Sequence, residues 1–165
     1  KRMGQSKSIT DGIIKAKYDT IVTLDGDGQN NPLDIGNLLT IYFKFKDVYL
    51  VSGIRHKRKD NFIKKISSRA ANIIRNYYLK DNCLDTGCSL KVFSRKIFLE
   101  MPYFNSIHRF IPALFVGKGH KVIYENVDHR VRIFGKTKYG IYNRLFRGLV
   151  DLYKVKKIIE SFKND

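Results

Sequence analysis

The sequence is poor in cysteine and has no long apolar run, and both shortages limit the kinds of protein that it can encode. Cys83 and Cys88 are the only two cysteines in 165 residues, too few for a disulfide framework or a four-ligand zinc site. We interpret them as reduced thiols of a cytosolic protein, with Cys88 packed in a strand. No secretory signal opens the chain, and no apolar run reaches the roughly 18 to 20 residues that a spanning helix requires. Any membrane contact is therefore expected to be peripheral.

Acidic residues are also scarce relative to basic ones. Lys and Arg number 32 against 15 Asp and Glu, which gives a formal net charge of +17. This surplus predicts attraction to polyanions such as phosphates, nucleic acid or an anionic membrane surface, without selecting one of them. The hydrophobic content of 43% is typical of a chain that folds, and the length suits one domain.

Helical and strand patterns alternate along the chain, which predicts an α/β sheet with helices on its faces. In such sheets, ligands gather at the carboxyl ends of the strands. The first strand is short and rich in β-branched residues, so we expect it to be buried and parallel to its neighbours. The predicted helices cover residues 5–17, 32–44, 62–79, 96–101, 110–116 and 141–163, and the predicted strands lie within 19–25, 47–53, 84–94 and 119–131.

Details of three helices can be predicted from local patterns. We expect Ser6 or Ser8 to cap the first helix and Pro32 to be the first residue of the second. Helical spacing places Phe43 on the apolar face of the second helix. The same spacing places Ile73 and Tyr77 on the apolar face of the third.

Two carboxylates follow the first predicted strand in the segment IVTLDGDGQNNP, residues 21–32. Side chains at positions i and i+2 of an extended segment point the same way, so Asp25 and Asp27 can converge. Carboxylates this close repel unless a cation or a shared proton lies between them, and oxygen ligands suit Mg²⁺ or Mn²⁺. Gln29 could add its amide oxygen. The alternative is a solvated turn, because Asp, Asn and Gly are ordinary turn formers.

Several segments, taken in order, resemble family 2 glycosyltransferases of the dolichol-phosphate or polyprenyl-phosphate sugar synthase type. They are GQSKSITDGIIKA, IVTLDGDGQNNP, VSGIRHKR, DTGCSLKVF, HRFIPAL and VDHRVRIFGKTKYG, and they extend over nearly the whole chain. DGDGQNNP looks like the DxD motif of that family. The resemblance implies a GT-A fold and a Mg²⁺ or Mn²⁺ cofactor. It also implies inverting transfer of a sugar from a GDP- or UDP-linked donor to a polyprenyl phosphate, either dolichyl or undecaprenyl.

On the donor side, the resemblance implies that Asp25, Asp27 and Gln29 hold the divalent ion. Asp25, Asp27, Gln29 and Arg55 would bind the donor, with Arg55 near its phosphates. The leaving nucleoside diphosphate gains negative charge, which the ion together with Arg55 or Arg132 would neutralise. Asp27, Arg55 and Arg132 are therefore the expected catalytic residues.

On the acceptor side, Lys64 and Ser68 match a basic residue and a serine near the acceptor phosphate. Arg132 and Lys138 match a basic loop that closes over donor and acceptor. Relatives that glycosylate a hydroxyl usually carry a carboxylate base where this chain has LDTGCS, and only Asp85 is available there. Asp85 would either orient the acceptor or cap the turn before Gly87. The weak case for a base favours a phosphate acceptor, which is already anionic.

The histidines are not expected to act as acids or bases. His56 and His120 are expected to be solvated, whereas His108 and His129 would organise structure or bind phosphate. Glu125 matches a recurring acid at a strand end and would anchor the basic loop.

Members of this family normally open with a strand of the type VVIPVYNE and a second strand that ends in Asp-Asp-Gly-Ser, and neither segment is present. We therefore expect residues 1–140 to form a partial GT-A domain without its first strands. Residues 141–165 would be a basic helix apposed to the cytoplasmic face of a membrane. Whether such a chain is active alone stays open.

Two other functions stay open at this point. A polyanion-binding or nucleic-acid-binding module would explain the charge and the interleaved Tyr and Arg. It would not explain Asp25 and Asp27, because carboxylates without a metal repel phosphates, so nucleic acid is not the expected partner. The other possibility is a non-catalytic relative of the glycosyltransferases.

Overall fold

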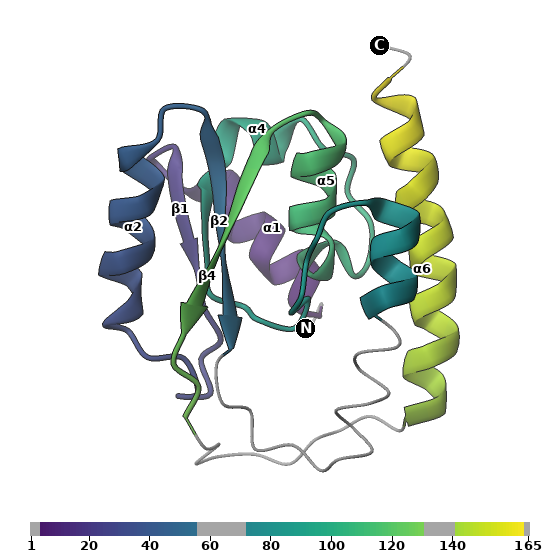
Figure 1. Ribbon diagram of the computed structural model, residues 1–165, viewed down its shortest axis with the longest axis horizontal. Helices are drawn as coiled ribbons and strands as arrows, with labels where there is room; N and C mark the ends of the chain where they lie inside the picture. The colour runs from purple at the N-terminus through teal and green to yellow at the C-terminus, as the bar shows by residue number, and fades with distance from the viewer. Residues whose placement is uncertain (1–3, 56–71, 131–140, 164–165) are drawn as a thin grey trace.

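The computed structural model describes residues 4–55, 72–130 and 141–163, with only the backbone described for 141–147. It forms a four-stranded sheet covered by helices on both faces, which confirms the predicted α/β class (Figure 1). In chain order the elements are α1 (Gln5–Lys15), β1 (Thr20–Thr23), α2 (Asp34–Lys44), β2 (Val48–Arg55), a helix that includes residues 72–79, β3 (Lys91–Ser94), α4 (Arg95–Leu99), the 3-10 helix η1 (Ile107–Arg109), α5 (Ile111–Gly117), β4 (Lys121–Val127) and α6 (Ile141–Ser161).

The strand order is β1-β3-β2-β4, and β3 runs opposite to the other three strands. The prediction of a buried parallel β1 is therefore wrong. β1 is an edge strand of the described sheet, and it pairs antiparallel with β3. A short run of β-branched residues predicts that a segment is extended, but it does not predict which strand the segment pairs with. Because β1, β2 and β4 run in the same direction, their carboxyl ends share one edge of the sheet, which we call the site edge.

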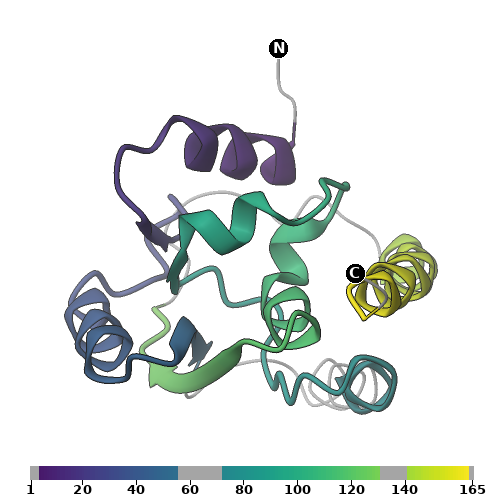
Figure 2. The same cartoon turned by 90° about the horizontal axis from the view of Figure 1, so that it is seen from above.

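The two faces of the sheet carry separate apolar cores. On one face, Leu50 and Phe93 are fully buried together with side chains of α1, α4, α5 and α6. On the other face, Val51 and Val92 pack with Leu38 of α2. Figure 2 shows α2 alone on its side of the sheet, opposite α1, α4 and α5. Burial of each such side chain contributes about 1.5 to 3 kcal/mol, so both layers stabilise the site edge.

The ends of α1 and α2 differ from the predicted ones. Gly4 is the N-cap of α1, and Ser6 and Ser8 lie inside the helix. Helix α2 begins at Asp34, two residues after Pro32. The Asn31 side chain accepts a hydrogen bond from the backbone N–H of Leu33 at 3.3 Å, so a turn precedes the helix where we expected its first residues.

Several apolar side chains that we expected on the buried faces of helices are exposed, among them Ile14 and Ile74. Phe43 on α2 is 67% exposed, and Ile73 and Tyr77 on the helix 72–79 are 70% and 79% exposed. That helix instead buries Arg75 and Leu79. The Arg75 guanidinium donates a hydrogen bond of 2.9 Å to Asp81, and this ion pair occupies the buried face. Residues 62–71 of the predicted helix lie outside the described residues.

Helix α6 packs against α5. Leu152 and Val155 belong to the larger core. A Cβ atom on Gly117, the last residue of α5, would lie 2.6 Å from Cγ1 of Ile159, so the two helices approach closely at a glycine. Among the helices of the described residues, none combines the length and the apolar composition needed to cross a membrane.

Candidate active site at the carboxyl end of the first strand

The backbone of Asp25 is held in place by two polar side chains. Its N–H lies 3.1 Å from Oδ1 of Asn30 and 3.0 Å from Oγ of Ser89, and the Ser89 hydroxyl also donates to Asn30 Oδ1 at 2.8 Å. The Asp25 carboxylate accepts a hydrogen bond of 3.0 Å from Gln5 on α1. The loop that follows β1 is therefore held by two other segments, through Gln5 and Ser89, and by its own Asn30.

The Asp27 side chain stabilises the turn in which it lies. Its Oδ1 accepts from the backbone N–H of Gln29 at 3.1 Å, and Gly28 between them has a φ of 75°. That φ favours glycine, because other residues rarely adopt the left-handed region. The segment therefore forms a turn, as in the alternative that we considered, and the same hydrogen bond orients the Asp27 carboxylate.

The segment after β4 lies directly beside this turn. Asn30 and His129 form an isolated antiparallel bridge, and the Arg130 N–H donates to the Gln29 carbonyl at 2.9 Å. Nε2 of Gln29 lies 3.2 Å from Nε2 of His129. The structure thus brings His129 to Gln29 and Asn30 from about 100 residues away in the sequence.

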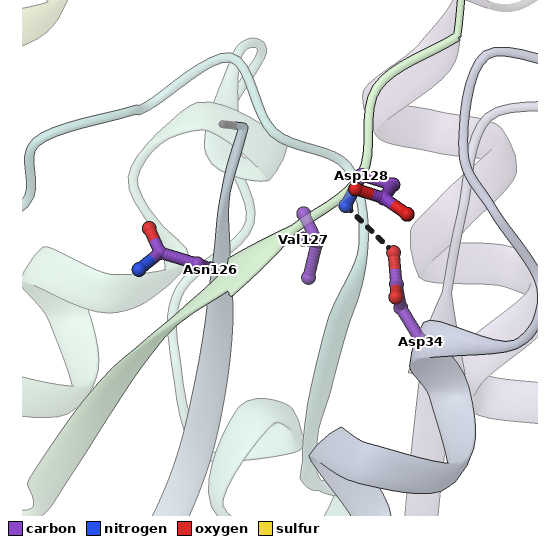
Figure 3. Close-up of a pocket in the computed structure, with 4 residues that line it drawn as sticks. All are labelled: Asp34, Asn126, Val127 and Asp128. Carbon is purple, nitrogen blue, oxygen red and sulfur yellow. Dashed lines mark hydrogen bonds between the residues drawn. The ribbon is translucent and has the colours of Figure 1, made fainter. Parts of the chain in front are cut away.

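A shallow hollow opens next to this contact, at the end of β4 (Figure 3). Its volume is about 240 Å³, and it is lined by Asp34, Asn126, Val127 and Asp128. The backbone N–H of Asp128 donates to the Asp34 carboxylate at 2.8 Å, which joins the start of α2 to the end of β4.

Arg55 and Asp85 form a bidentate ion pair at the end of β2. Arg55 Nε and Nη2 each lie 2.7 Å from a different Asp85 oxygen. The same carboxylate accepts from the backbone N–H groups of Arg55 and Gly87, at 3.1 and 3.2 Å. Asp85 is only 7% exposed. It therefore caps the turn before Gly87, one of the two roles that we left open, and it also orients Arg55.

Gly87 makes room for this ion pair. A Cβ atom at position 87 would lie 2.6 Å from Nη2 of Arg55. The Asp-Thr-Gly segment therefore combines a carboxylate that holds the guanidinium with a residue small enough to let it approach.

The remaining predicted site residues divide into two groups. Lys64, Ser68, Arg132 and Lys138 lie outside the described residues, as does His56. Their roles stay predictions.

His108, His120 and Glu125 lie within the described residues. Nδ1 of His108 lies 2.8 Å from the Ser6 hydroxyl, and burial together with Arg109 and Lys91 lowers the pKa of His108 to about 4. His108 is therefore neutral near pH 7. His120 is only half-buried and contacts the rings of Tyr49 and Phe115. The proposed role of Glu125, which lies in β4, stays a prediction.

Sequence reasoning missed three residues of this region, Asn30, Ser89 and Lys91. Asn30 and Ser89 lie inside the segments that carry the family resemblance, so their signal was present but unassigned. Lys91 is the first residue of the buried strand KVFS. Lysine is almost never fully buried, and the sequence alone does not show that this one is.

The cysteines behave as inert core residues. Cys83 and Cys88 are buried free thiols, and Cys88 belongs to the core on the α2 face. The predicted packing of Cys88 is confirmed, but its predicted place in a strand is wrong, because β3 begins at Lys91. Burial raises the pKa of both thiols, so both are protonated near pH 7.

The donor set fits a divalent ion that arrives together with a diphosphate. Within residues 4–55, 72–130 and 141–163, no three His, Cys, Asp or Glu side chains converge as a ready-made metal cage. Mg²⁺ typically uses one or two carboxylates, several waters and the phosphates of a substrate. Asp25 and Asp27 can supply the carboxylates of such a site.

Comparison with known families decides the class of protein. The model of the family described as glycosyl transferase family 2 matches residues 1–101. This chain belongs to glycosyl transferase family 2. The match includes Asp25, Asp27, Arg55 and Asp85, and it confirms the resemblance on which the predicted site rests.

Two relatives of this family 2 chain carry informative names. It is 35% identical over 158 residues to dodecaprenyl-phosphate galacturonate synthase of Rhizobium johnstonii, covering 94% of the chain and 46% of that protein. It is 32% identical over 137 residues to undecaprenyl-phosphate 4-deoxy-4-formamido-L-arabinose transferase of Pectobacterium carotovorum, covering 83% and 41%. The chain thus spans less than half the length of either relative.

Solved structures confirm the GT-A-like fold. Glucosyl-3-phosphoglycerate synthase from Mycobacterium tuberculosis in complex with UDP superposes with a TM-score of 0.66 at 13% identity, covering 94% of this chain and 56% of that one. The same enzyme has been crystallised with Mn²⁺ and UDP-glucose, at a TM-score of 0.62 and 13% identity, covering 93% and 54%. Mannosyl-3-phosphoglycerate synthase from Rubrobacter xylanophilus gives 0.66 at 11% identity, covering 93% and 49%.

Proposed function

We propose that this family 2 chain transfers a sugar, with inversion, from a nucleoside-diphosphate donor to a polyprenyl phosphate. The observation that carries the proposal is the fixed turn after β1, in which Asn30 and Ser89 hold the backbone of Asp25 and Asp27 follows two residues later. The names of the two relatives support the acceptor class. The UDP complexes of the structural neighbour make a UDP-sugar the first donor to test.

The chemistry requires a nucleophile and a stabilised leaving group. A phosphate oxygen of the acceptor attacks the anomeric carbon, and the bond from that carbon to the donor diphosphate breaks. The electron pair leaves with the nucleoside diphosphate. The acceptor needs no base, and this agrees with Asp85, whose carboxylate accepts four hydrogen bonds from Arg55 and Gly87.

Asp25 and Asp27, assisted by Gln29, would hold Mg²⁺ or Mn²⁺ at the donor diphosphate. When bound, the ion would neutralise charge on the leaving group. Arg55 would contact a donor phosphate through its guanidinium. Lys64, Ser68, Arg132 and Lys138 are proposed to bind the acceptor phosphate.

The test is Asp27→Ala in the 165-residue chain. The chain is incubated with Mn²⁺, a UDP-sugar and undecaprenyl phosphate in detergent micelles, and the lipid-linked sugar is counted. Loss of a metal contact worth several kcal/mol predicts a decrease of about 100-fold or more in kcat/KM. Calorimetry of UDP binding with and without Mn²⁺ provides a readout that does not depend on turnover.

Asp47→Ala is the matched control. Asp47 is an exposed carboxylate 3.0 Å from Lys121, at the opposite end of β2 from the site edge, and its removal is expected to leave transfer unchanged. If Asp27→Ala also leaves transfer unchanged, the proposal is wrong. Oligonucleotide binding that is tight at physiological salt and insensitive to Mn²⁺ would instead support the polyanion-binding module.

We also propose that α6 and the helix 72–79 rest on an anionic membrane at its cytoplasmic face. The two helices lie side by side, with Lys156 Nζ 5.2 Å from the centre of the Tyr78 ring (Figure 2). Both expose apolar side chains, each close to half exposed or more: Ile73, Ile74, Tyr77 and Tyr78 on one helix, Leu149, Val150 and Tyr153 on the other. Lysines on α6 flank this surface, which is the pattern of helices that lie in an anionic lipid interface.

A further inference from the structure

One face of the sheet changes from apolar to polar as it approaches the site edge. Residues paired across neighbouring strands point to the same face, and so do residues two apart within a strand. Ile21, Phe93, Leu50 and Val122 are paired in this way and line the larger core. The next set on that face consists of Thr23, Lys91, Ser52 and Tyr124, which we call the polar rung.

Three members of the polar rung hold main-chain carbonyls of one segment, residues 81–89. Thr23 Oγ1 donates to the Ser89 carbonyl at 2.7 Å, and the Tyr124 hydroxyl donates to the Asp81 carbonyl at 2.6 Å. Lys91 Nζ donates to the Cys88 carbonyl. The polar rung therefore supports the segment that contains Asp85.

Lys91 differs from the other members because it brings an ionisable amine into the interior. It is only 2% exposed. In the described part of the chain, its Nζ has no carboxylate within ion-pair distance, and the Cys88 carbonyl is its one hydrogen-bond acceptor. An ammonium can donate three hydrogen bonds, and burying it without a counterion is costly.

Lys91 is linked to Asp85 through Cys88. Its Nζ donates to the Cys88 carbonyl, and the Cys88 N–H donates to the Asp85 carbonyl at 3.3 Å. Burial lowers the pKa of Lys91, and Cys88, Cys83, Asp85 and Asp25, in decreasing order of effect, oppose that shift. Lys91 is therefore tied to the segment whose Asp85 holds Arg55.

We propose that Lys91 is a positioning residue whose hydrogen bond to the Cys88 carbonyl keeps Asp85 in place. Through Asp85, it orients Arg55 toward the phosphates of the reaction. The inference rests on the proposed function for its substrates, but its structural part concerns only the residues described above.

The test compares variants of one rung. Lys91→Met keeps the length of the side chain and removes its hydrogen-bond donors, whereas Lys91→Arg keeps donors at that position. Thr23→Val is the matched control, since it removes a neutral hydrogen bond to the same segment. Loss of an outer-shell partner typically decreases activity by about 10- to 100-fold, and we expect that decrease in kcat/KM for Lys91→Met. We expect partial recovery in Lys91→Arg and a decrease of less than about 3-fold in Thr23→Val, since the loss of one neutral bond is a small effect.

Two further measurements separate positioning from a general loss of structure. Hydrogen exchange of the amides in 81–90 is expected to be about 10-fold or more faster in Lys91→Met, with exchange in α2 unchanged. If Lys91 acts through Asp85, adding Lys91→Met to Asp85→Asn is expected to lower kcat/KM by less than the product of the single effects.

The outcomes that overturn the inference are separate from those that overturn the function. Wild-type kcat/KM and wild-type exchange in Lys91→Met would overturn the role of Lys91, and so would an equal loss in Thr23→Val. If the wild-type chain transfers no sugar to any polyprenyl phosphate, the proposed function is wrong. Hydrogen exchange then still measures whether Lys91 stabilises residues 81–89.

Discussion

The carboxylate of Asp85 determines how Arg55 can meet a ligand. Arg55 gives Nε and Nη2 to Asp85, so its guanidinium is fixed in one plane before any phosphate binds. A preorganised guanidinium loses little conformational entropy when it binds a ligand. At this scale, the function of the site depends on the residues that hold Arg55 as much as on Arg55 itself.

Gly87→Ala tests this arrangement. The added Cβ would lie 2.6 Å from Arg55 Nη2, so the guanidinium must move away from Asp85. We expect the free energy of unfolding to fall by about 1 to 3 kcal/mol, because the buried Asp85 carboxylate loses hydrogen bonds from Arg55. Because Arg55 loses its orientation, kcat/KM for sugar transfer is expected to fall by about 10-fold or more.

Gly36→Ala is the control for this prediction. Gly36 lies in α2 with open space around it, so alanine there is expected to preserve activity and to stabilise the helix by up to about 1 kcal/mol. Wild-type turnover in Gly87→Ala would show that Arg55 does not need its bond to Asp85.

Among the secondary-structure elements, α6 depends on one close contact with α5. The Ile159 side chain lies against Gly117, where any larger residue would meet the β-branched Ile159 side chain at 2.6 Å. Ile159 is stiff at χ1 and cannot move away easily. The position of α6 on the domain is therefore sensitive to a single methyl group.

Gly117→Ala is expected to lower the free energy of unfolding by about 1 to 3 kcal/mol, the usual cost of overpacking, as measured by urea denaturation. Gly148→Ala provides the comparison, because the Gly148 position in α6 has no neighbour within 4 Å of an added Cβ. Ile159→Ala combined with Gly117→Ala should recover part of the lost stability. A strictly additive double variant would contradict the contact.

Local sequence patterns predicted the elements better than their surroundings. The spacing of Leu38 and the β-branched run of β1 reflect local preferences, and α2 and β1 formed as expected. The strand that pairs with β1 is β3, which lies about 70 residues later in the sequence. No local pattern predicts this pairing. Tyr77 was assigned to the wrong face because the buried face of its helix is occupied by Arg75, an ion-paired residue that hydrophobic spacing does not count.

The candidate site was predictable to the extent that it follows the family motifs. Asp25, Asp27 and Arg55 lie at the site edge because the carboxyl ends of β1 and β2 lie there. The supporting residues Asn30 and Lys91 were not predicted, because their importance arises from contacts across the sheet that appear only in the folded chain.

On the scale of the whole molecule, the surplus of positive charge and the exposed apolar side chains of α6 suggest a common partner. An anionic bilayer can satisfy both, because lysines meet lipid headgroups while Leu149, Val150 and Tyr153 enter the interface. Cosedimentation with vesicles of phosphatidylglycerol, compared with phosphatidylcholine, measures this association.

Replacing Leu149, Val150 and Tyr153 by Glu is expected to weaken vesicle binding by about 10-fold or more, since each change removes apolar burial and adds a repelled charge. Phe43→Glu is the control, because Phe43 is an equally exposed apolar residue on α2, on the other side of the sheet. Equal loss in both variants, or equal binding to both kinds of vesicle, would contradict the proposed membrane contact.

The ion pair of Arg55 and Asp85 also limits how this scaffold can diverge in evolution. A descendant that modified a sugar or protein hydroxyl would need a proton acceptor with an available lone pair. Asp85 could take that role only by releasing Arg55 and the Gly87 amide, which would weaken the proposed contact of Arg55 with the donor phosphates. At this one side chain, a change to a hydroxyl acceptor would therefore be coupled to weaker binding of the donor.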